Sequence, residues 1–164
     1  MEHISTSTHP AAEAEYPHIA EQAIDLPGLL RMAQNPEAGA VVLFSGEVRL
    51  HNAGKEVDCL EYESHIPMAH KIVAGILEDA RSKWGLHGAV CQHRVGKLSV
   101  GETAVVVVTS SAHRSEAYEA NRYIIDRVKH EATIWKKEVY ADGSHAWGSN
   151  CSCGDPAHQY GHPH

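Results

Sequence analysis

The sequence has neither a long apolar run nor many cysteines. Its most apolar window, from Ala104 to Val108, has the length of a buried strand, whereas a membrane-spanning helix needs about 18 consecutive apolar residues. The first residues contain neither the basic nor the apolar part of a secretory signal. Four cysteines are too few and too unevenly spaced for a secreted disulfide scaffold. These absences predict a cytoplasmic protein with free thiols and no membrane partner.

Common catalytic and nucleotide-binding motifs are also absent, because the chain contains no GxGxxG, P-loop, GxSxG or HExxH pattern. The formal net charge of -7 argues against a protein that coats nucleic acid through its overall field. Basic residues nevertheless gather in one segment, which holds six of the 14 lysines and arginines: Arg114, Arg122, Arg127, Lys129, Lys136 and Lys137. Composition therefore favours a local anion-binding site in an otherwise acidic chain.

A length of 164 residues suits one domain with tails. We expect the domain at residues 17–150, between flexible tails at residues 1–16 and 151–164. The C-terminal tail contains side chains that can bind zinc, namely Cys151, Cys153, His158, His162 and His164. Because Cys-x-Cys lacks the spacing typical of zinc sites, we predict a flexible tail without a structural metal.

Hydrophobic periodicity predicts an α+β domain. A continuous apolar run predicts a strand at residues 39–48 that is buried on both faces, and residues 50–56 have the composition of a loop. A helix at residues 67–84 is indicated by apolar residues at every fourth position, Met68, Ile72, Ile76, Ala80 and Trp84, with Gly85 ending it. The other expected elements are helices at 27–34 and 115–130 and strands at 57–63, 89–95, 103–110 and 134–140. This order favours a mixed or antiparallel sheet with helices packed on one face.

Two lysines stand where a helix is expected to turn into a strand. Lys129 comes at the end of the helix, and Lys136 lies within the strand that follows. Two ammonium groups held close together lower each other's pKa, which makes a lysine usable as a general acid or base near neutral pH. The alternative is a pair of solvated surface lysines, and spacing by itself favours that alternative because most lysines are exposed.

Three further basic residues stand at strand ends. His113 and Arg114 lie where a buried strand gives way to a helix, whose N-terminal N–H groups and positive dipole suit an anion. Arg49 follows the strand that contains Gly46. For His113 and Arg114, an anion site and an ordinary exposed turn are equally compatible with the pattern. For Arg49, an exposed arginine at a strand edge is at least as common.

Two other features have competing interpretations. Trp135, beside Lys136, suits stacking on a flat heterocycle, although a buried core tryptophan is the commoner outcome. Glu61 and Glu63 share a strand face, but alternate carboxylates on a strand usually point to water rather than form a catalytic pair. Composition and spacing alone therefore support only an anion-binding α+β domain.

Five ordered motifs together resemble the molybdopterin synthase catalytic-subunit family, from about Gly39 to Trp147. They are GAVVLFSGEVR (39–49), LEYESHIPMA (60–69), HRVGKLSVGE (93–102), SSAHRSEAYEA (110–120) and DRVKHEATIWKKE (126–138). The resemblance implies a hammerhead-like α+β fold. It also implies a homodimer that forms a heterotetramer with two copies of a small ubiquitin-like sulfur carrier, whose C-terminal Gly-Gly ends in a thiocarboxylate. The implied reaction transfers sulfur to cyclic pyranopterin monophosphate, forming the molybdopterin dithiolene without a redox cofactor.

The same resemblance implies roles for individual residues. Lys129 and Lys136 match the family's functional lysines. We infer, beyond the resemblance itself, that Lys129 lies beside the carrier's terminal carbonyl and Lys136 on the pterin side. The residues expected to bind substrate are Arg49, His113, Arg114 and, as an apolar wall, Phe44. The chain departs from the family pattern at Thr133, where proline is common, so the entry to the following strand is looser.

Two other classes of function compete with this interpretation. One is a non-catalytic module whose basic pocket holds an anion or a ubiquitin-like tail. The other is a metal-responsive protein that works through residues 151–164.

Overall fold

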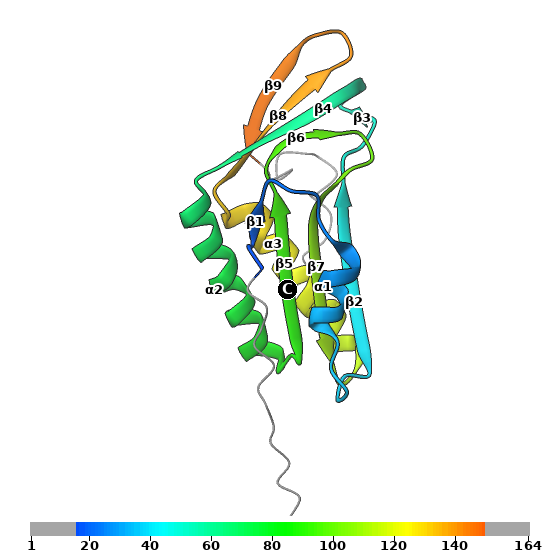
Figure 1. Cartoon of the computed structure of the whole chain (residues 1–164), viewed down its shortest axis with the longest axis vertical. Helices are drawn as coiled ribbons and strands as arrows, with labels where there is room; N and C mark the ends of the chain where they lie inside the picture. Colours follow the sequence, from blue (N-terminus) through cyan, green and yellow to red (C-terminus); the bar gives the residue numbers. More distant parts are fainter. Residues whose placement is uncertain (1–15, 150–164) are drawn as a thin grey trace, which may run out of the picture.

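The computed structural model describes residues 16–149. Within them every predicted helix and strand is present, with ends within two residues of those expected (Figure 1). The elements are β1 (Ile19–Ala20), α1 (Leu26–Ala33), β2 (Ala40–Glu47), β3 (His51–Asn52), β4 (Lys55–Ser64), α2 (Ile66–Trp84), β5 (Gly88–Arg94), β6 (Gly96–Ser99), β7 (Thr103–Ser111), α3 (Arg114–Glu131), β8 (Ile134–Tyr140) and β9 (His145–Ser149). The prediction of a plain loop at residues 50–56 is wrong, because β3 and the start of β4 form a hairpin there. The turn of this hairpin is made by Ala53 and Gly54, both with positive φ.

The two expected tails fall mostly outside the described residues. Residues 1–15 and 150–164 are not described, so the predicted C-terminal tail with its cysteines and histidines lies outside the structure. Tyr16, which we placed in the N-terminal tail, is held against the domain because its hydroxyl oxygen accepts a hydrogen bond from the Cys91 N–H at 2.9 Å.

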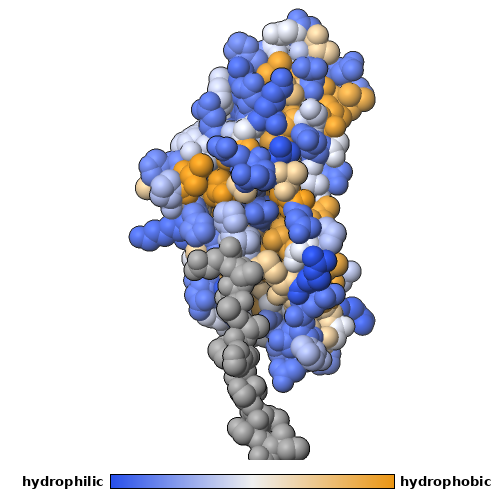
Figure 2. Space-filling model, in the orientation of Figure 1, coloured by the Kyte–Doolittle hydropathy of each residue, from blue (hydrophilic) through white to orange (hydrophobic). Residues whose placement is uncertain are grey.

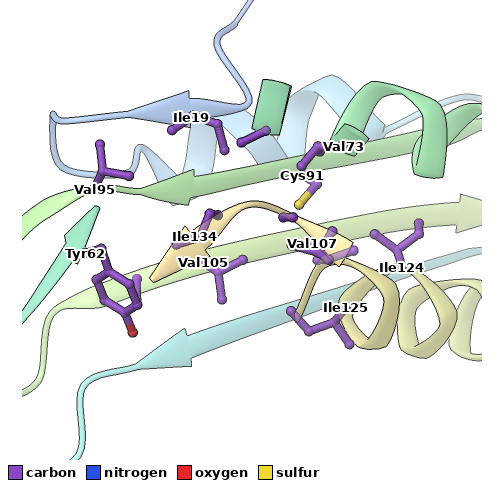
Figure 3. Packing of buried hydrophobic residues seen from close by; sticks show 14 of the residues in the cluster. Ile19, Tyr62, Val73, Cys91, Val95, Val105, Val107, Ile124, Ile125 and Ile134 are labelled. Carbon is purple, nitrogen blue, oxygen red and sulfur yellow. The ribbon is translucent and has the colours of Figure 1, made fainter. Parts of the chain in front are cut away.

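The first sheet has the strand order β1-β5-β7-β2. β1 pairs with β5 in parallel, and the other neighbours are antiparallel. The two long helices, α2 and α3, pack on one face, where Val105 and Val107 of β7 meet Ile124 and Ile125 of α3 (Figure 3). The alternate residues Val106 and Val108 face the opposite side and pack with α1. β7 is buried on both faces because helices cover both of them, and this is why it consists almost entirely of small and β-branched residues.

β2 is an edge strand of this sheet, and the prediction that both of its faces are buried is wrong. Val41, Leu43 and Phe44 are 40%, 38% and 37% exposed. β7 pairs with one edge of β2 through an unbroken register from Ala40 to Gly46, but no strand of the described part of the chain covers the other edge. The apolar run therefore forms a partly exposed apolar surface at the edge of the sheet.

The second sheet has the order β3-β4-β8-β9, with β6 also paired to β4. Figure 1 shows it lying across one end of the first sheet, which gives a hammerhead-like outline. The register of β4 shifts between Val57 and Cys59, and this bulge turns Val57 into the same core as Leu60 and Tyr62. The irregularity explains why residues 57–63 alternate imperfectly in the sequence.

Helix α2 begins and ends as predicted, but its buried face is rotated. Pro67 occupies the first turn, and Gly85 ends the helix in the left-handed conformation at φ 59°. The buried residues are Ala69, Val73, Ile76, Leu77 and Ala80, whereas Met68 is 51% exposed. The true stripe follows the spacing of three and four residues rather than every fourth position, because 3.6 residues complete one turn.

None of the helices within residues 16–149 combines the length and the apolar character that crossing a membrane requires. On the face shown in Figure 2, hydrophilic residues cover most of the surface and apolar residues form separate patches. The cytoplasmic location stays a prediction.

Candidate functional site

Lys129 and Lys136 meet at the junction between the end of α3 and the start of β8. The chain turns back within a few residues there, and the Ser64 hydroxyl of β4 fixes the turn by donating to the carbonyl oxygen of Thr133 at 2.8 Å. The two ammonium groups are close enough that the charge of Lys136 contributes to lowering the pKa of Lys129. The structure thus brings the two lysines together at the edge where the two sheets join, and their chemical roles stay a prediction.

The environment of Lys129 favours loss of its proton. Burial is the main cause that lowers the pKa of Lys129 from 10.5 to about 8, and the positive charge of Lys136 is the second cause. The C-terminal end of α3 acts in the opposite direction, since its dipole favours a cation in the last turn. At pH 7 about a tenth of Lys129 is neutral, whereas an exposed lysine is almost fully charged.

Lys136 is positioned by a buried carboxylate. Glu138 is 7% exposed, and its Oε1 lies 3.2 Å from the Lys136 Nζ. Its other oxygen, Oε2, accepts hydrogen bonds from the Tyr140 hydroxyl at 2.5 Å and from the Asn52 side-chain amide at 2.6 Å. Burial by itself raises the pKa of Glu138, but the hydrogen bonds from Tyr140, Asn52 and Lys136 hold it below its usual value. The carboxylate is therefore ionised at neutral pH and fixes the direction of the Lys136 side chain.

A neutral histidine lies on the inner side of Lys129. His93 is fully buried, and burial together with the charge of Lys129 lowers the pKa of His93 to about 3, although its contact with the Arg94 carbonyl acts in the opposite direction. Since the carbonyl oxygen of Arg94 lies 2.6 Å from the Nδ1 of His93, that nitrogen carries the proton. The ring of His93 meets the ring of Tyr62 edge to face, with centroids 5.0 Å apart. Burial, and then Glu138, raises the pKa of Tyr62 to about 12.

The sequence did not single out Glu138, His93 or Tyr62 as site residues. Each lies inside one of the motifs that carry the family resemblance, and this was the available signal. Their grouping depends on contacts between β4, β5 and β8, so no local spacing reveals it.

Arg49 lies at the same end of the first sheet as the lysines. β2 runs antiparallel to β7. α3 also runs antiparallel to β7, because hydrogen bonds join Thr109 to the carbonyl oxygen of Ala117 and Asn121 to the carbonyl oxygen of Val107. The end of β2 and the end of α3 consequently lie at one end of the sheet. Arg49 follows β2 directly and is exposed.

His113 and Arg114 lie at the opposite end of α3. His113 is the N-cap residue, Arg114 is the first helical residue, and both are exposed. Sixteen residues of α3 separate His113 from Lys129, which corresponds to about 24 Å along the helix. A single copy of the chain therefore does not bring these two residues to the lysines. Phe44 also lies apart, on the exposed β2 face, where it lines a cavity of about 380 Å³ together with Tyr118 and Arg122.

Trp135 is 47% exposed, so the expectation of a buried core tryptophan is wrong. It lies on the outward face of β8, opposite Glu63 of β4, while Lys136 points to the other face. Glu61 contacts Lys137 at 3.7 Å and Glu63 is exposed, so neither forms part of a carboxylate pair, as expected. Among the described residues, no group of three or more histidine, cysteine or acidic side chains is arranged to hold a metal.

The fold and the site together define an α+β protein in which a largely buried lysine, Lys129, lies close to Lys136 and its partner Glu138, an arrangement suited to anionic groups. The chain belongs to the MoaE family, because the family model described as "MoaE protein" matches residues 19–131. The chain is 46% identical over 123 residues to the molybdopterin synthase catalytic subunit of Nostoc sp., with 74% of each chain covered. It is 42% identical over 125 residues to the subunit of the same name from Bacillus subtilis, with 76% of this chain and 80% of that protein covered.

Solved structures agree with this assignment. The crystal structure of molybdopterin synthase from Staphylococcus aureus superimposes with a TM-score of 0.76 and 39% identity, covering 80% of this chain and 95% of that chain. A complex of subunits 1 and 2 of molybdopterin-converting factor from Helicobacter pylori has a TM-score of 0.65 at 22% identity, covering 79% of this chain and 88% of that one, and it supports the fold alone. The α+β, hammerhead-like fold expected from the sequence is confirmed.

Proposed function

We propose that this chain is the catalytic subunit of a molybdopterin synthase. It takes sulfur from the C-terminal thiocarboxylate of a small ubiquitin-like carrier and transfers it to cyclic pyranopterin monophosphate. The observation that carries the proposal is the pair of Lys129, with its pKa near 8, and Lys136, held by Glu138. Both substrates are anions, and fixed cations in a partly dry site stabilise such groups better than water does.

The two lysines divide the work in this proposal. In each of two transfers, the thiocarboxylate sulfur attacks a carbon of the pterin side chain and displaces the oxygen bound to that carbon. Water then attacks the carrier's carbonyl carbon and breaks its bond to the sulfur, which leaves the sulfur on the pterin and a carboxylate on the carrier. Lys129 donates a hydrogen bond to the carrier's terminal carbonyl and supplies a proton to the leaving oxygen, since its pKa lies close to neutral pH. Lys136, which is fixed by Glu138, contacts the pterin side and its phosphate.

We also propose that the enzyme works as a homodimer joined through the exposed β2 edge. Antiparallel pairing of two β2 strands about a two-fold axis places the start of one strand beside the end of the other. Ala40 at the start of β2 pairs with Ser111, two residues before His113, whereas Arg49 follows its end. Such pairing brings His113 and Arg114 of the second copy to the end of the sheet that holds Arg49 and Lys129, and thereby completes the basic pocket.

The carrier is proposed to dock against the outward face of the β8–β9 hairpin, and two carriers on one dimer give the heterotetramer. Trp135 and Trp147 are 47% and 51% exposed there, and the Lys137 Nζ lies 5.7 Å from the centroid of the Trp147 ring. Exposed tryptophans beside a basic residue are typical of sites that contribute most of the binding energy in protein interfaces. A carrier held on this face has a short path for its C-terminal tail to reach Lys129 and Lys136.

Reconstitution with a thiocarboxylated carrier and the cyclic pterin precursor tests the proposed reaction. Lys129→Ala is expected to reduce formation of the dithiolene product by a factor of about 100 or more, because both a proton donor and a cation are lost. Lys71→Ala, on the exposed side of α2, is the matched control and should retain full activity. Removal of residues 151–164 should leave the transfer largely intact. Unchanged product formation by Lys129→Ala would instead identify a non-catalytic binding module.

A further inference from the structure

A cavity of about 570 Å³ opens at the edge of β5, at the end of that strand far from the lysines. β1 pairs only with His93 and Arg94, so within residues 16–149 no strand lies beside residues 88–90 of β5 on this side. α1 and α2 flank the gap, as Figure 1 shows, and the segment at residues 16–18 crosses it. The lining of the cavity ends on β5 at Val90, three residues before His93, so about 10 Å of extended strand lies between the cavity and the candidate catalytic site.

Polar side chains take the place of the missing strand. Arg81 donates from Nη2 to the carbonyl oxygen of Ala89 at 2.9 Å, and the Cys91 carbonyl oxygen lies 3.0 Å from Nδ1 of His18. These contacts give hydrogen-bond partners to two carbonyl oxygens at the edge of β5, and they use only one nitrogen of each side chain. A guanidinium group carries five N–H donors and an imidazole has two nitrogens, so both side chains retain capacity for a ligand.

The lining of the cavity offers basic groups to a ligand, although the chain as a whole has a formal net charge of -7. Arg81 is charged at neutral pH, three histidines, His18, His70 and His87, line the cavity with it, and no carboxylate is among its described lining residues. Glu78 and Glu37 contact Arg81 and His87 at 3.8 Å, but their side chains are 72% and 80% exposed and lie outside the lining. An anionic ligand in this cavity therefore meets one fixed cation, Arg81, together with imidazoles that can take up a proton.

The protonation of His18 depends on its neighbours. Burial lowers the pKa of His18, and nearby His70 and Arg81 lower it further, while the hydrogen bond to the Cys91 carbonyl acts in the opposite direction. Tyr16 and the backbone of β5 also face His18. An anion bound among these groups would favour the protonated form of His18.

The rest of the lining suits a flat apolar body. The rings of His18 and His70 lie 4.6 Å apart between centroids and are tilted by 34°, and apolar walls are supplied by Met32, Ala74, Leu77 and Val90. Imidazole rings and a methionine sulfur both make favourable contacts with aromatic rings. The volume falls within the range of small-molecule pockets, which spans about 300–1,000 Å³.

We propose that this cavity binds a small organic anion that carries a flat ring. The acid group of the ligand pairs with Arg81 and the imidazoles of His18 and His70, and the ring packs against Met32 and Leu77. This site is separate from the lysine site and does not depend on the proposed sulfur transfer.

Titration of the full-length chain with benzoate tests the site. Benzoate should shift the imidazole C–H NMR signals of His18 and His70 in a saturable way, with a dissociation constant in the millimolar range expected for so few atoms. Benzyl alcohol, which has the ring but not the charge, should give no saturable shift, and inorganic phosphate should bind at least about tenfold more weakly than benzoate. Arg81→Gln should weaken benzoate binding about tenfold or more, since a charge-assisted hydrogen bond is lost.

Lys71→Gln is the control, because it removes a positive charge from α2 outside the lining and should leave the affinity unchanged. His70→Ala is a second variant in case Arg81→Gln does not fold, and it should also weaken binding while sulfur transfer stays normal. The proposal is overturned if neither histidine signal moves in the wild-type chain. It is equally overturned if benzyl alcohol or phosphate binds as well as benzoate, or if Lys71→Gln weakens binding as much as Arg81→Gln.

Discussion

Replacing Lys129 with methionine should make the domain more stable at neutral pH while it removes the catalytic amine. The folded state lowers the pKa of Lys129 from 10.5 to about 8, so the buried ammonium opposes folding. A difference of this size corresponds to about 3 kcal/mol at most, at about 1.4 kcal/mol per pKa unit. Methionine keeps the length and the apolar stem but loses the contacts of the ammonium group. We therefore expect a net gain of about 1 to 2 kcal/mol in the free energy of unfolding at pH 7.

The sign of the pH dependence makes this prediction specific. Below pH 8 Lys129 is protonated in both the folded and the unfolded state, so the full free-energy cost of burying its ammonium group opposes folding. Between pH 8 and 10.5 the unfolded chain binds the extra proton, so the stability contributed by Lys129 rises with pH. The advantage of Lys129→Met over the wild type should therefore shrink as the pH rises through this window.

Urea unfolding at pH 7 and at a pH above 9, followed by circular dichroism, measures the stability gained by Lys129→Met and the change of that gain with pH. Lys71→Met is the matched control, because Lys71 is exposed on α2 and its replacement should change stability by less than about 0.5 kcal/mol at either pH. The reasoning is refuted if Lys129→Met is less stable than the wild type at pH 7. It is also refuted if the stability difference does not change with pH, because burial would then not be the source of the low pKa.

Four more outcomes are expected. Glu138→Gln should destabilise the domain by about 2 kcal/mol and slow sulfur transfer about tenfold, since the amide cannot replace the ion pair with Lys136, while exposed Glu63→Gln should do neither. The kcat/KM of transfer should fall as the pH rises through about 8, because the proton donor Lys129 is then neutral. Leu43→Asp on β2 should convert a dimer into monomers in light scattering and abolish transfer, whereas a protein that stays dimeric would exclude this interface. Thr133→Val should raise stability by about 1 kcal/mol in urea unfolding, because the buried Thr133 hydroxyl has no hydrogen-bond partner within the described residues, and a loss would contradict this.

Most helices and strands could be predicted from the sequence, because the residues that start, end and favour each element lie within it or next to it. Pro67 and Gly85 fix the ends of α2, and the β-branched run of β7 identifies the most buried strand. The rotation of the buried face of α2 was missed because which side of a helix is covered depends on the sheet against which it packs. The exposure of β2 was missed for a similar reason. An apolar run indicates a surface that avoids water, but it does not tell whether that surface packs within the chain or stays exposed on it.

The candidate site likewise contains residues that the sequence pointed to and residues that only the structure revealed. The sequence places Lys129 and Lys136 on either side of a short turn, and the family resemblance, rather than their spacing, favoured a shared site. The contact between Asn52 and Glu138 joins positions 86 apart in the chain, and it exists only because the β3–β4 hairpin folds against β8. His93 is likewise brought to Lys129 by the packing of β5 against the helices. Glu138 fixes the direction of Lys136, and His93 lies beside Lys129, so the sequence pointed to the candidate lysines and missed the residues that surround them.

On the proposed function, the cost of burying Lys129 has a direct counterpart in substrate binding. Two opposite charges about 4 Å apart interact with about 4 kcal/mol at the effective dielectric constant of a protein surface, four times the value in water. The burial that lowers the pKa of Lys129 therefore also strengthens its attraction for a thiocarboxylate or a phosphate. An anion that enters raises the pKa of Lys129 again, so the amine is protonated most fully when both substrates are in place. A solvated lysine would gain little from the same anion, and this explains why the reactive cation lies in a half-buried position that weakens the unloaded fold.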